Sequence, residues 1–335
     1  MKHILLQTTL LALLVLLSVA CDKVSPQGVL MAGTAVDDRV KMSELYFRQH
    51  KQEIIEGTAY AESYSFLIGA DSHVTTDTMR MAEYFQNGLD NDDMFWAHLG
   101  DIADTKPEYY IHLANTIETF KDMYIDKYFD RINDFVYRSK ENGEDYYRDE
   151  IVFPFFPVVG NHDITHNGWA LWADLFHTSF YSFVIHVGDP DKKEVDVFFF
   201  LDSASGTLGA KQIELIEDGL LDTVIKGFNV RNAFAFTHTN LFRPNFMQFA
   251  STFPREELYY LIDQFNEWSI DYAFCGHVHA WDEHTFGGCK YLTLDSMCEA
   301  NNPKAGDYLV RVKVAEDGTI SWEKVHMAYE PPAKK

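Results

Sequence analysis

Residues 66–73 of this 335-residue chain have the sequence FLIGADSH, in which a continuous apolar run ends at two polar side chains of metal-binding type. A short apolar run without alternation is typical of a strand covered on both faces of a sheet. Asp71 and His73 follow the run at positions i and i+2, and side chains with this spacing point the same way in an extended segment. The stretch therefore predicts a buried strand that delivers a carboxylate and an imidazole to one ion.

Four further apolar runs along the chain end in polar motifs of the same type. They are 94–99 before Gly100-Asp101, 153–159 before Gly160-Asn161-His162-Asp163, 233–237 before His238, and 272–275 before Gly276-His277-Val278-His279. Open α/β sheets place their sites at the carboxyl ends of the strands, so these motifs are expected to meet. A glycine before Asp101, Asn161 and His277 suits tight turns and a close approach of the backbone.

Helical patterns separate the apolar runs, which indicates one mixed α/β domain. Pro107 in a capped start predicts a helix from there to about residue 140, either packed on the sheet or forming a cap beside the site. A second helix is expected to begin at 251–254. The segments 308–314 and 320–325 alternate like antiparallel strands. The folded part is expected to start near residue 60.

The candidate ligands supply both oxygen and nitrogen donors. Two Asp and one Asn contribute oxygen and four His contribute nitrogen, a mixture that suits Mn, Fe or Zn better than Ca or Mg. Seven ligands are too many for one tetrahedral ion, but they can hold two ions when a carboxylate bridges them. Two such ions activate a bridging hydroxide and clamp a phosphoryl group for in-line attack. The candidate metal ligands are Asp71, His73, Asp101, Asn161, His238, His277 and His279.

The five motifs resemble those of the calcineurin-like metallophosphoesterase superfamily, whose pattern is D-x-H, G-D-x-x-D, G-N-H-D/E, a lone His and G-H-x-H. All five occur here in that order between residues 71 and 279, about two thirds of the chain. The resemblance implies an αββα sandwich, in which two mixed sheets are flanked by helices and a dinuclear metal site lies at the strand ends.

The resemblance also implies a role for each residue of the site. Asp71, His73 and His279 would hold the first ion, Asn161, His238 and His277 would hold the second, and Asp101 would bridge them. His162 would contact the phosphate and protonate the leaving oxygen, with Asp104 orienting its ring. An acidic partner raises the pKa of an imidazole and fixes its tautomer, so this pair is chemically sensible. Asp104 has an alternative interpretation as the cap of a helix that starts near Thr105.

At several positions the sequence differs from particular branches of this superfamily, which narrows the set of branches that it resembles. Asp104 stands where purple acid phosphatases carry Tyr, so a tyrosinate–iron(III) site is not expected. Thr105-Lys106 stands where protein serine/threonine phosphatases continue with Arg-Gly, and too few residues remain for the C-terminal domain of the 5′-nucleotidases. The resemblance leaves a broad set of bacterial phosphodiesterases and phosphatases of uncertain substrate.

The first 20 residues have the pattern of a bacterial export signal. A basic start precedes a largely apolar stretch at 4–19 that is short for a membrane span. The sequence LSVAC at 17–21 resembles a lipobox, in which Cys21 becomes the lipidated first residue of the mature protein. A plain cleaved signal and a retained anchor are the alternatives. The expected organisation is a signal peptide at 1–20, a lipidated tether and lead-in at 21–59, and a metallophosphoesterase domain at 60–330.

The formal charge of −23 argues against binding to nucleic acid, which requires a basic surface. It does not exclude a phosphorylated substrate, because bound metal ions supply local positive charge. Cys275 lies in an apolar run, which favours a position in the core. Cys289 and Cys298 could pair in an exported protein, although their spacing alone does not show it.

These features predict an exported two-metal hydrolase of small phosphate esters, anchored to a membrane by lipid at Cys21 on the periplasmic or cell-surface side. Phosphodiesterase and phosphomonoesterase activities both fit this prediction. The alternative from another class is a surface binding protein that kept the fold without turnover, which predicts a missing ligand or a broken His162–Asp104 pair. A metal-dependent hydrolase of a non-phosphate ester is a third possibility.

Overall fold

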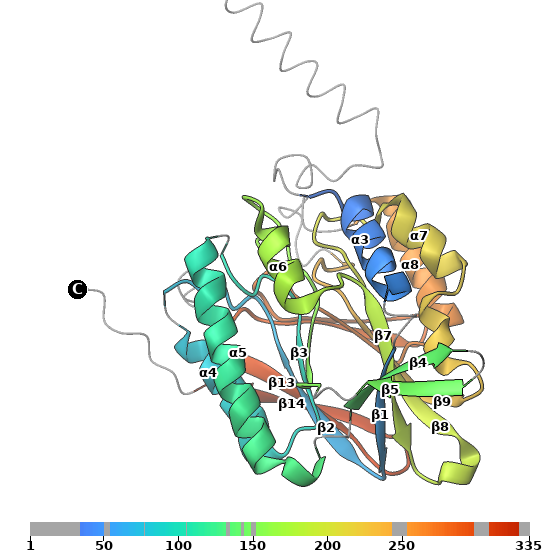
Figure 1. The fold of residues 1–335 in the computed structure, drawn as a ribbon. Helices are drawn as coiled ribbons and strands as arrows, with labels where there is room; N and C mark the ends of the chain where they lie inside the picture. Colours follow the sequence, from blue (N-terminus) through green and yellow to red (C-terminus); the bar gives the residue numbers. More distant parts are fainter. Residues whose placement is uncertain are drawn as a thin grey trace, which may run out of the picture.

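The computed structural model describes residues 34–49, 54–76, 78–104, 106–131, 135–141, 144–148, 152–242, 253–297 and 308–327. Within these residues the chain forms two mixed β-sheets packed face to face, with helices on both outer faces (Figure 1). The αββα sandwich expected from the sequence is therefore confirmed.

The smaller sheet has five strands in the order β14-β13-β2-β3-β6. Their bounds are β2 Tyr64–Gly69, β3 Trp96–His98, β6 Phe155–Pro157, β13 Tyr308–Val314 and β14 Ile320–His326. β2, β3 and β6 are parallel neighbours, whereas β13 pairs antiparallel with both β2 and β14. Because neighbouring parallel strands end at the same edge of a sheet, the loops after β2, β3 and β6 emerge side by side.

The larger sheet has nine strands in the order β11-β12-β10-β9-β8-β7-β1-β4-β5. Their bounds are β1 Ile54–Ala61, β4 Phe135–Glu141, β5 Glu144–Arg148, β7 Tyr181–Val187, β8 Glu194–Phe200, β9 Asn229–Phe236, β10 Tyr272–Cys275, β11 Asp282–Phe286 and β12 Cys289–Thr293. β8, β9, β10 and β12 run parallel to one another. The loops after β9 and β10 therefore leave from one edge of this sheet as well.

Helices of the described residues cover both outer faces of the sandwich. α4 (Met79–Asn91), α5 (Pro107–Lys127) and α6 (Gly168–Phe176) pack on the smaller sheet. α3 (Val36–Gln49), α7 (Gly209–Glu217) and α8 (Arg255–Glu267) pack on the larger sheet, on the opposite side of Figure 1. Short 3₁₀ turns complete the connections at η1 Phe129–Arg131, η2 Pro190–Lys192 and η3 Leu221–Ile225.

Phenylalanine rings fill much of the space between the sheets. Phe66 of β2 meets Phe198 of β8 and Phe234 of β9 edge to face, with ring centroids 5.6 and 5.5 Å apart. Each such aromatic pair contributes about 0.5–1.5 kcal/mol beyond the burial of its area. Phe199 of β8 points the other way, into the layer between the larger sheet and its helices. Both faces of β8 are therefore covered, which explains why its sequence is apolar without alternation. This packing holds the strand ends, and the loops that follow them, in fixed positions.

The structure corrects two expected boundaries. α3 and β1 precede residue 60, and β1 lies inside the larger sheet between β7 and β4, so the folded region begins well before residue 60. The helix expected to reach about residue 140 ends at Lys127, and Phe135–Glu141 form β4 instead. Phe135, Val136 and Tyr137 fit a strand by their aromatic and β-branched side chains, and Phe135 is buried between the sheets.

Several expectations about the N-terminal segment and the cysteines lie outside the described residues. Residues 1–33 contain the expected export signal and Cys21, and Cys298 also lies outside. Among the described helices, none combines the length and the apolar character that crossing a membrane requires. Cys275 and Cys289 are both buried, as expected for Cys275.

Candidate metal centre

The loops after β2, β3, β6, β9 and β10 meet at one edge of the sandwich and bring the candidate ligands together. Five of the seven ligands are buried, and His277 and His279 are half-buried. Six of the seven, together with Asp104 and His162, form groups in which the donor atoms all lie within 4.8 Å of one another. These groups are Asp71, His73, Asp101 and His279; Asp101, His238 and His277; and His73, Asp104 and His162.

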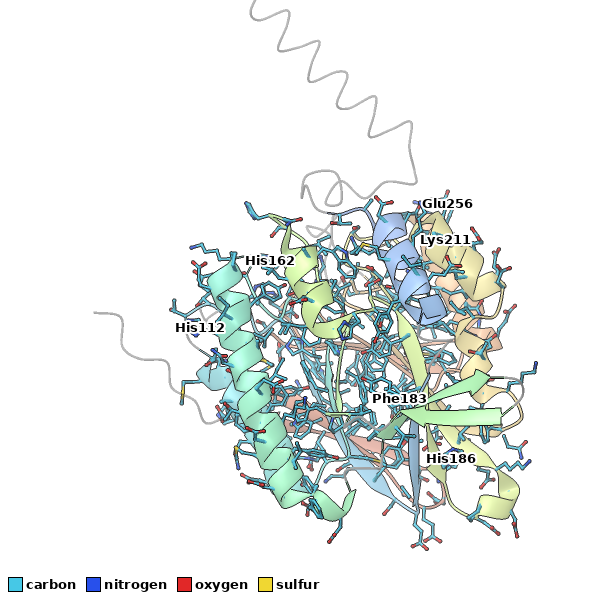
Figure 2. The ribbon with its side chains drawn as sticks, viewed as in Figure 1. His112, His162, Phe183, His186, Lys211 and Glu256 are labelled. Atoms are coloured by element: carbon cyan, nitrogen blue, oxygen red, sulfur yellow. The ribbon has the colours of Figure 1, made fainter. Side chains whose placement is uncertain are left out.

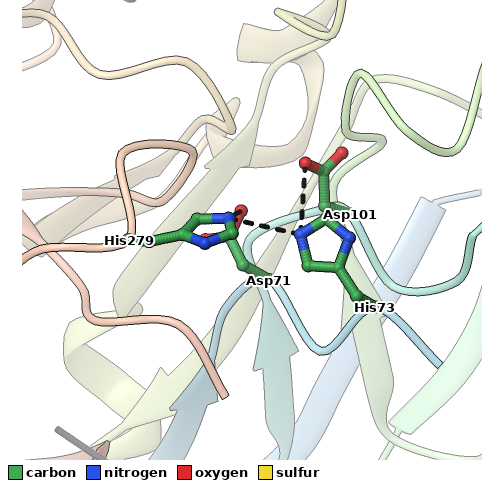
Figure 3. Close-up of side chains that lie close together, drawn as sticks. All are labelled: Asp71, His73, Asp101 and His279. Carbon is green, nitrogen blue, oxygen red and sulfur yellow. Dashed lines mark hydrogen bonds and ion pairs between the residues drawn. The ribbon is translucent and has the colours of Figure 1, made fainter. Parts of the chain in front are cut away.

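The first group is drawn in Figure 3. His73 Nε2 lies 3.2 Å from His279 Nε2, so two ring nitrogens approach the same point. Carboxylates flank them, with Asp71 Oδ1 3.4 Å from His279 Nε2 and Asp101 Oδ2 3.8 Å from His73 Nε2. Imidazole and carboxylate donors that converge in this way are the arrangement a divalent cation requires.

Asp101 also takes part in the second group. Its Oδ2, which faces His73, lies 3.5 Å from His238 Nε2. The same nitrogen of His238 lies 2.8 Å from Asn161 Oδ1 and 3.1 Å from His277 Nδ1. One carboxylate oxygen therefore stands between two clusters of ligands, which is the position of a bridging ligand.

The tautomer of His238 shows that the second group fits a cation. Its Nδ1 lies 2.8 Å from the Leu99 carbonyl oxygen, which can only accept, so Nδ1 carries a hydrogen. In the neutral ring, Nε2 then presents a lone pair toward Asn161 Oδ1 and Asp101 Oδ2, which are themselves acceptors. A metal ion satisfies such buried lone pairs, and a metal-bound His usually donates its other N–H to a carbonyl or carboxylate.

Metal binding requires neutral imidazoles and ionised carboxylates, and three of the candidate ligands have pKa values that meet this requirement. Burial lowers the pKa of His277 to about 4, so its ring is neutral at pH 7. For Asp71, burial favours the protonated form, but the hydrogen bond with His279 and the nearby rings of His279, His238 and His73 together outweigh it and hold the pKa well below the ordinary value. Burial likewise opposes ionisation of Asp101, yet the nearby His238 and His73 lower its pKa.

The backbone of the ligands is strained. Five of the eleven non-glycine residues with positive φ in the described part of the chain are candidate ligands. A non-glycine residue held in the left-handed region costs of order 1–3 kcal/mol and persists only where the surroundings enforce it. Strain of this kind gathers at functional sites, which agrees with a metal centre here. The five are Asp71, His73, Asp101, His277 and His279, with φ between 42° and 74°.

His162, labelled in Figure 2, lies beside the ligand clusters, in a group with His73 and Asp104. Its Nδ1 is 3.2 Å from Asp104 Oδ1, and the same oxygen is 3.2 Å from His73 Nδ1. The His162 and Asp104 side chains are 39% and 37% exposed, whereas that of His73 is 2% exposed. The hydrogen bond with Asp104 raises the pKa of His162, which favours the protonated ring. A proton is thus held beside the clusters, where a substrate can reach it.

Asp104 serves the histidines rather than the helix that follows it. α5 begins at Pro107 with Lys106 as its N-cap residue, so the interpretation of Asp104 as the cap does not hold. Burial works to raise the pKa of Asp104, but hydrogen bonds with His162 and His73 lower it well below the ordinary value. The ionised carboxylate therefore orients a candidate ligand and the candidate proton donor together.

Asp163 is a functional residue that the sequence reasoning did not identify. Its fully buried carboxylate accepts hydrogen bonds from the backbone N–H groups of Gly160, Ile102 and Ala103, at 2.8, 3.0 and 3.2 Å. It also accepts from the Tyr110 hydroxyl of α5 at 3.2 Å. Asp163 thereby ties the loop of Asp101 to the loop of Asn161. The signal that could have revealed it is its place as the fourth residue of Gly-Asn-His-Asp.

Ser203 holds the loop of His238 in place. No pattern in the sequence indicates this role. Its hydroxyl oxygen accepts the backbone N–H groups of His238 and Thr239, both at 2.9 Å. The preceding Asp202 forms a fully buried ion pair with Arg39 of α3, with Arg39 Nη2 2.7 Å from Asp202 Oδ1. This chain of contacts connects the first described helix to a candidate ligand.

Gly160→Ala is expected to displace Asp101 and weaken metal binding. A Cβ at Gly160 would overlap the backbone nitrogen and the Oδ1 of Asp101, neither of which can move independently of the site. Overpacking of this kind costs typically about 1–3 kcal/mol of stability. The measurement is bound metal per chain together with the thermal midpoint. Gly227→Ala is the control for a glycine substitution outside the site, because its Cβ would meet no atom within 4 Å. The φ of +91° at Gly227 strains any other residue, so this variant is expected to melt earlier while its metal content stays at the wild-type level. Unchanged metal content in Gly160→Ala would contradict the expectation.

No protein-family model matches the sequence, and no curated protein matches it. Solved structures of similar fold include the protein GAP50, titled the anchor in the inner membrane complex of Plasmodium, at 13% identity over 79% of this chain and 85% of that chain, with a TM-score of 0.48. A dimetal phosphatase from Danio rerio matches at 12% identity over 78% of this chain and 95% of that chain, with a TM-score of 0.45.

A purple acid phosphatase from yellow lupin (Lupinus luteus) seeds matches at 14% identity over 79% of this chain and 52% of that chain, with a TM-score of 0.48. Likeness at this level carries no information about activity, so the function has to be argued from the site itself.

Proposed function

We propose that this chain is a metallophosphoesterase that hydrolyses small phosphate esters with two divalent ions, Mn, Fe or Zn. The position of Asp101 Oδ2 carries the proposal, because it lies 3.8 Å from His73 Nε2 and 3.5 Å from His238 Nε2. A carboxylate shared between two clusters of imidazole donors suits a two-metal site, and two-metal sites are typical of phosphatases and nucleases.

Two sets of residues would hold the ions, with Asp101 common to both. The first set is Asp71, His73 and His279, and the second is Asn161, His238 and His277. When bound, the ions supply a nucleophilic water of lowered pKa and offset the negative charge of the phosphoryl oxygens. The net charge of −23 makes this offset necessary, because the protein as a whole repels an anionic substrate.

His162 acts as the general acid in this proposal. Asp104 accepts the Nδ1–H of His162, which leaves Nε2–H to donate a proton to the leaving oxygen. The raised pKa of His162 supports this role, because the ring retains its proton closer to neutral pH. Asp104 fixes the ring through a contact that also orients His73, so proton donation and metal binding share one carboxylate.

The proposal is tested with the purified full-length chain. Bound metals are measured by elemental analysis, and turnover is assayed with bis-p-nitrophenyl phosphate, p-nitrophenyl phosphate and p-nitrophenyl acetate. About two metals per chain and hydrolysis of a phosphate ester are expected, and the preferred ester distinguishes a diesterase from a monoesterase. Hydrolysis of the acetate alone would indicate a non-phosphate esterase. Bound metal without any turnover would favour the surface binding protein, and no bound metal would contradict the ligand assignment.

Metal removal is expected to lower the thermal midpoint. A bound ion removes the repulsion between the converging lone pairs and charged carboxylates of the site. At a free metal concentration of 100 times Kd, binding stabilises the folded state by about 2.7 kcal/mol per site. Calorimetry before and after EDTA, with Mn or Zn added back, measures the effect. EDTA saturated with Zn beforehand is the control for the chelator itself. An identical midpoint in all samples would count against a metal centre.

We also propose that the chain is exported and anchored by lipid at Cys21, as residues 1–21 support. Intact mass in the native bacterial host is expected to show loss of residues 1–20 and addition of lipid, and Cys21→Ser is expected to retain residues 1–20. Cys289→Ser serves as the control, because that buried thiol has no part in processing. Loss of residues 1–20 without added lipid would instead indicate a plain cleaved signal.

A further inference from the structure

His98 is a fully buried histidine at the end of β3, three residues before Asp101. The backbone N–H of Gly100 donates to its Nδ1 at 3.2 Å, so Nδ1 presents a lone pair. The hydrogen of the neutral ring then resides on Nε2, and burial lowers the pKa of His98 to about 3, which keeps the ring neutral. His98 is therefore held as one defined tautomer.

The Nε2–H of His98 has no hydrogen-bond partner among the described residues. The rings of Tyr84 and Phe155 stand nearly perpendicular to it, with centroids 6.1 and 6.4 Å away. A buried polar group left unpaired costs about 1–3 kcal/mol, and an apolar side chain of similar size would avoid that cost. Such an unpaired group in a folded protein requires an explanation. We find the explanation at the other ring nitrogen, Nδ1, which accepts the Gly100 N–H.

The three residues that follow His98 contact or supply three candidate ligands. The Leu99 carbonyl oxygen accepts from His238 Nδ1 at 2.8 Å. The Gly100 carbonyl oxygen accepts the backbone N–H of Asp71 at 3.1 Å. The third residue is Asp101 itself.

The Gly100 turn is closely packed against two other loops of the site. Gly100 has a φ of +88°, and a Cβ on it would lie 2.8 Å from Gly160 Cα and from His238 Nδ1. Among the described residues, the hydrogen bond that its N–H donates is the one to His98 Nδ1. A small rotation of this peptide would therefore change the positions of ligands in both clusters at once.

We propose that His98 is a positioning residue for the metal centre, whose Nδ1 lone pair fixes the Gly100 peptide and through it Asp71, Asp101 and His238. The proposal rests on the proposed function for its consequence in metal binding, while its structural part concerns the Gly100 peptide alone. Replacing a residue that orients metal ligands without binding the metal typically lowers metal affinity or activity by about 10–100-fold.

The test compares three substitutions at this position. His98→Asn places an amide oxygen near the position of Nδ1 and retains an acceptor for the Gly100 N–H. His98→Gln carries its amide to the position of Nε2, and His98→Leu has no acceptor at all. His186→Leu is the matched control, because His186 is also a buried strand histidine and lies toward the opposite end of the molecule from His162 (Figure 2).

Two measurements separate positioning from packing. In the metal-free full chain, NMR-detected exchange of the Gly100 amide hydrogen is expected to accelerate by at least about 10-fold in His98→Leu and His98→Gln. It is expected to stay near the wild-type rate in His98→Asn and in the His186→Leu control. Zn affinity, measured by competition with a chelating dye, is expected to fall about 10–100-fold in the same two variants.

Each result bears on one claim. Unchanged Gly100 exchange in His98→Leu, or equal exchange in His98→Asn and His98→Gln, would overturn the proposal. The Asn and Gln variants decide the matter if the Leu variant does not fold. Wild-type protein that binds no Zn would contradict the proposed function, while the exchange rates would still judge the role of His98. Accelerated exchange with unchanged Zn affinity would confine His98 to the turn and overturn its role in the metal centre.

Discussion

Asp101→Asn is expected to reduce phosphate ester hydrolysis by roughly 10³-fold or more and to lower bound metal from about two ions to one or fewer. A neutral amide cannot balance the charge of two dications from the position between His73 and His238. The metal-free variant is expected to be somewhat less stable than wild type, because the lowered pKa of Asp101 shows that its surroundings favour the charged carboxylate. Asparagine tolerates the φ of +51° at this position, so backbone strain adds little to this loss.

Asp196→Asn is the matched control for loss of a buried carboxylate. Asp196 lies in β8 and pairs with Arg231 at 2.7 Å, and it also accepts from the Tyr64 hydroxyl at 2.7 Å. Breaking a buried pair costs about 3–5 kcal/mol, so this variant is expected to melt earlier while its folded fraction keeps both metals. The measurements are elemental analysis, kcat with bis-p-nitrophenyl phosphate and thermal melting. Wild-type metal content and turnover in Asp101→Asn would rule out the bridging assignment.

His162→Gln is expected to lower kcat by about 10²–10⁴-fold for an alkyl phosphate ester, while bound metal stays at the wild-type level. The alkoxide that leaves requires a proton, which His162 would donate. A p-nitrophenolate leaves without needing one, so the loss with p-nitrophenyl substrates is expected to be much smaller. Asp104→Asn is expected to show the same dependence on the leaving group, with some loss of metal because Asp104 also contacts His73.

His112→Gln is the control for a histidine substitution outside the site, because His112 is an exposed residue of α5 (Figure 2). It is expected to leave both rates and the metal content unchanged. Steady-state kinetics with a methyl ester and a p-nitrophenyl ester of the same phosphate provide the comparison. An equal loss with both esters in His162→Gln would exclude proton donation, and a loss of metal would make His162 a ligand instead.

Local sequence was sufficient to predict the parts of the site in which a strand and its ligand are close in the chain. Residues 66–73 contain both the buried strand β2 and the pair Asp71 and His73, so the pattern and the chemistry are visible together. The same holds for Gly276-His277-Val278-His279 after β10. Residues that act by accepting backbone N–H groups were missed, because Ser203 and His98 depend on contacts that no spacing in the sequence indicates.

The pairing of strands that lie far apart in the chain could not be predicted from the sequence either. Phe135 fits the apolar spacing of the preceding helix, and only its place in β4 beside β1 shows that it belongs to the larger sheet. β1 itself gains its partner β7 from more than a hundred residues further along the chain, in the parallel pairing of Ile55 with Phe183. Local propensity cannot report such a pairing, because its stability comes from neighbours that are remote in the chain.

The sequence by itself predicted the candidate donor residues, because the type of side chain and the apolar strand before it are both visible in the local sequence. Only the tertiary structure decided that Asp101 Oδ2 stands between His73 and His238, and that Asp104 Oδ1 contacts both His73 and His162. The distance from Asp101 to His238 joins loops of two different sheets, and the packing of one sheet against the other sets it. The other distances join loops that follow neighbouring strands of the smaller sheet. A shift of one loop by an ångström would leave every motif intact and disrupt the site.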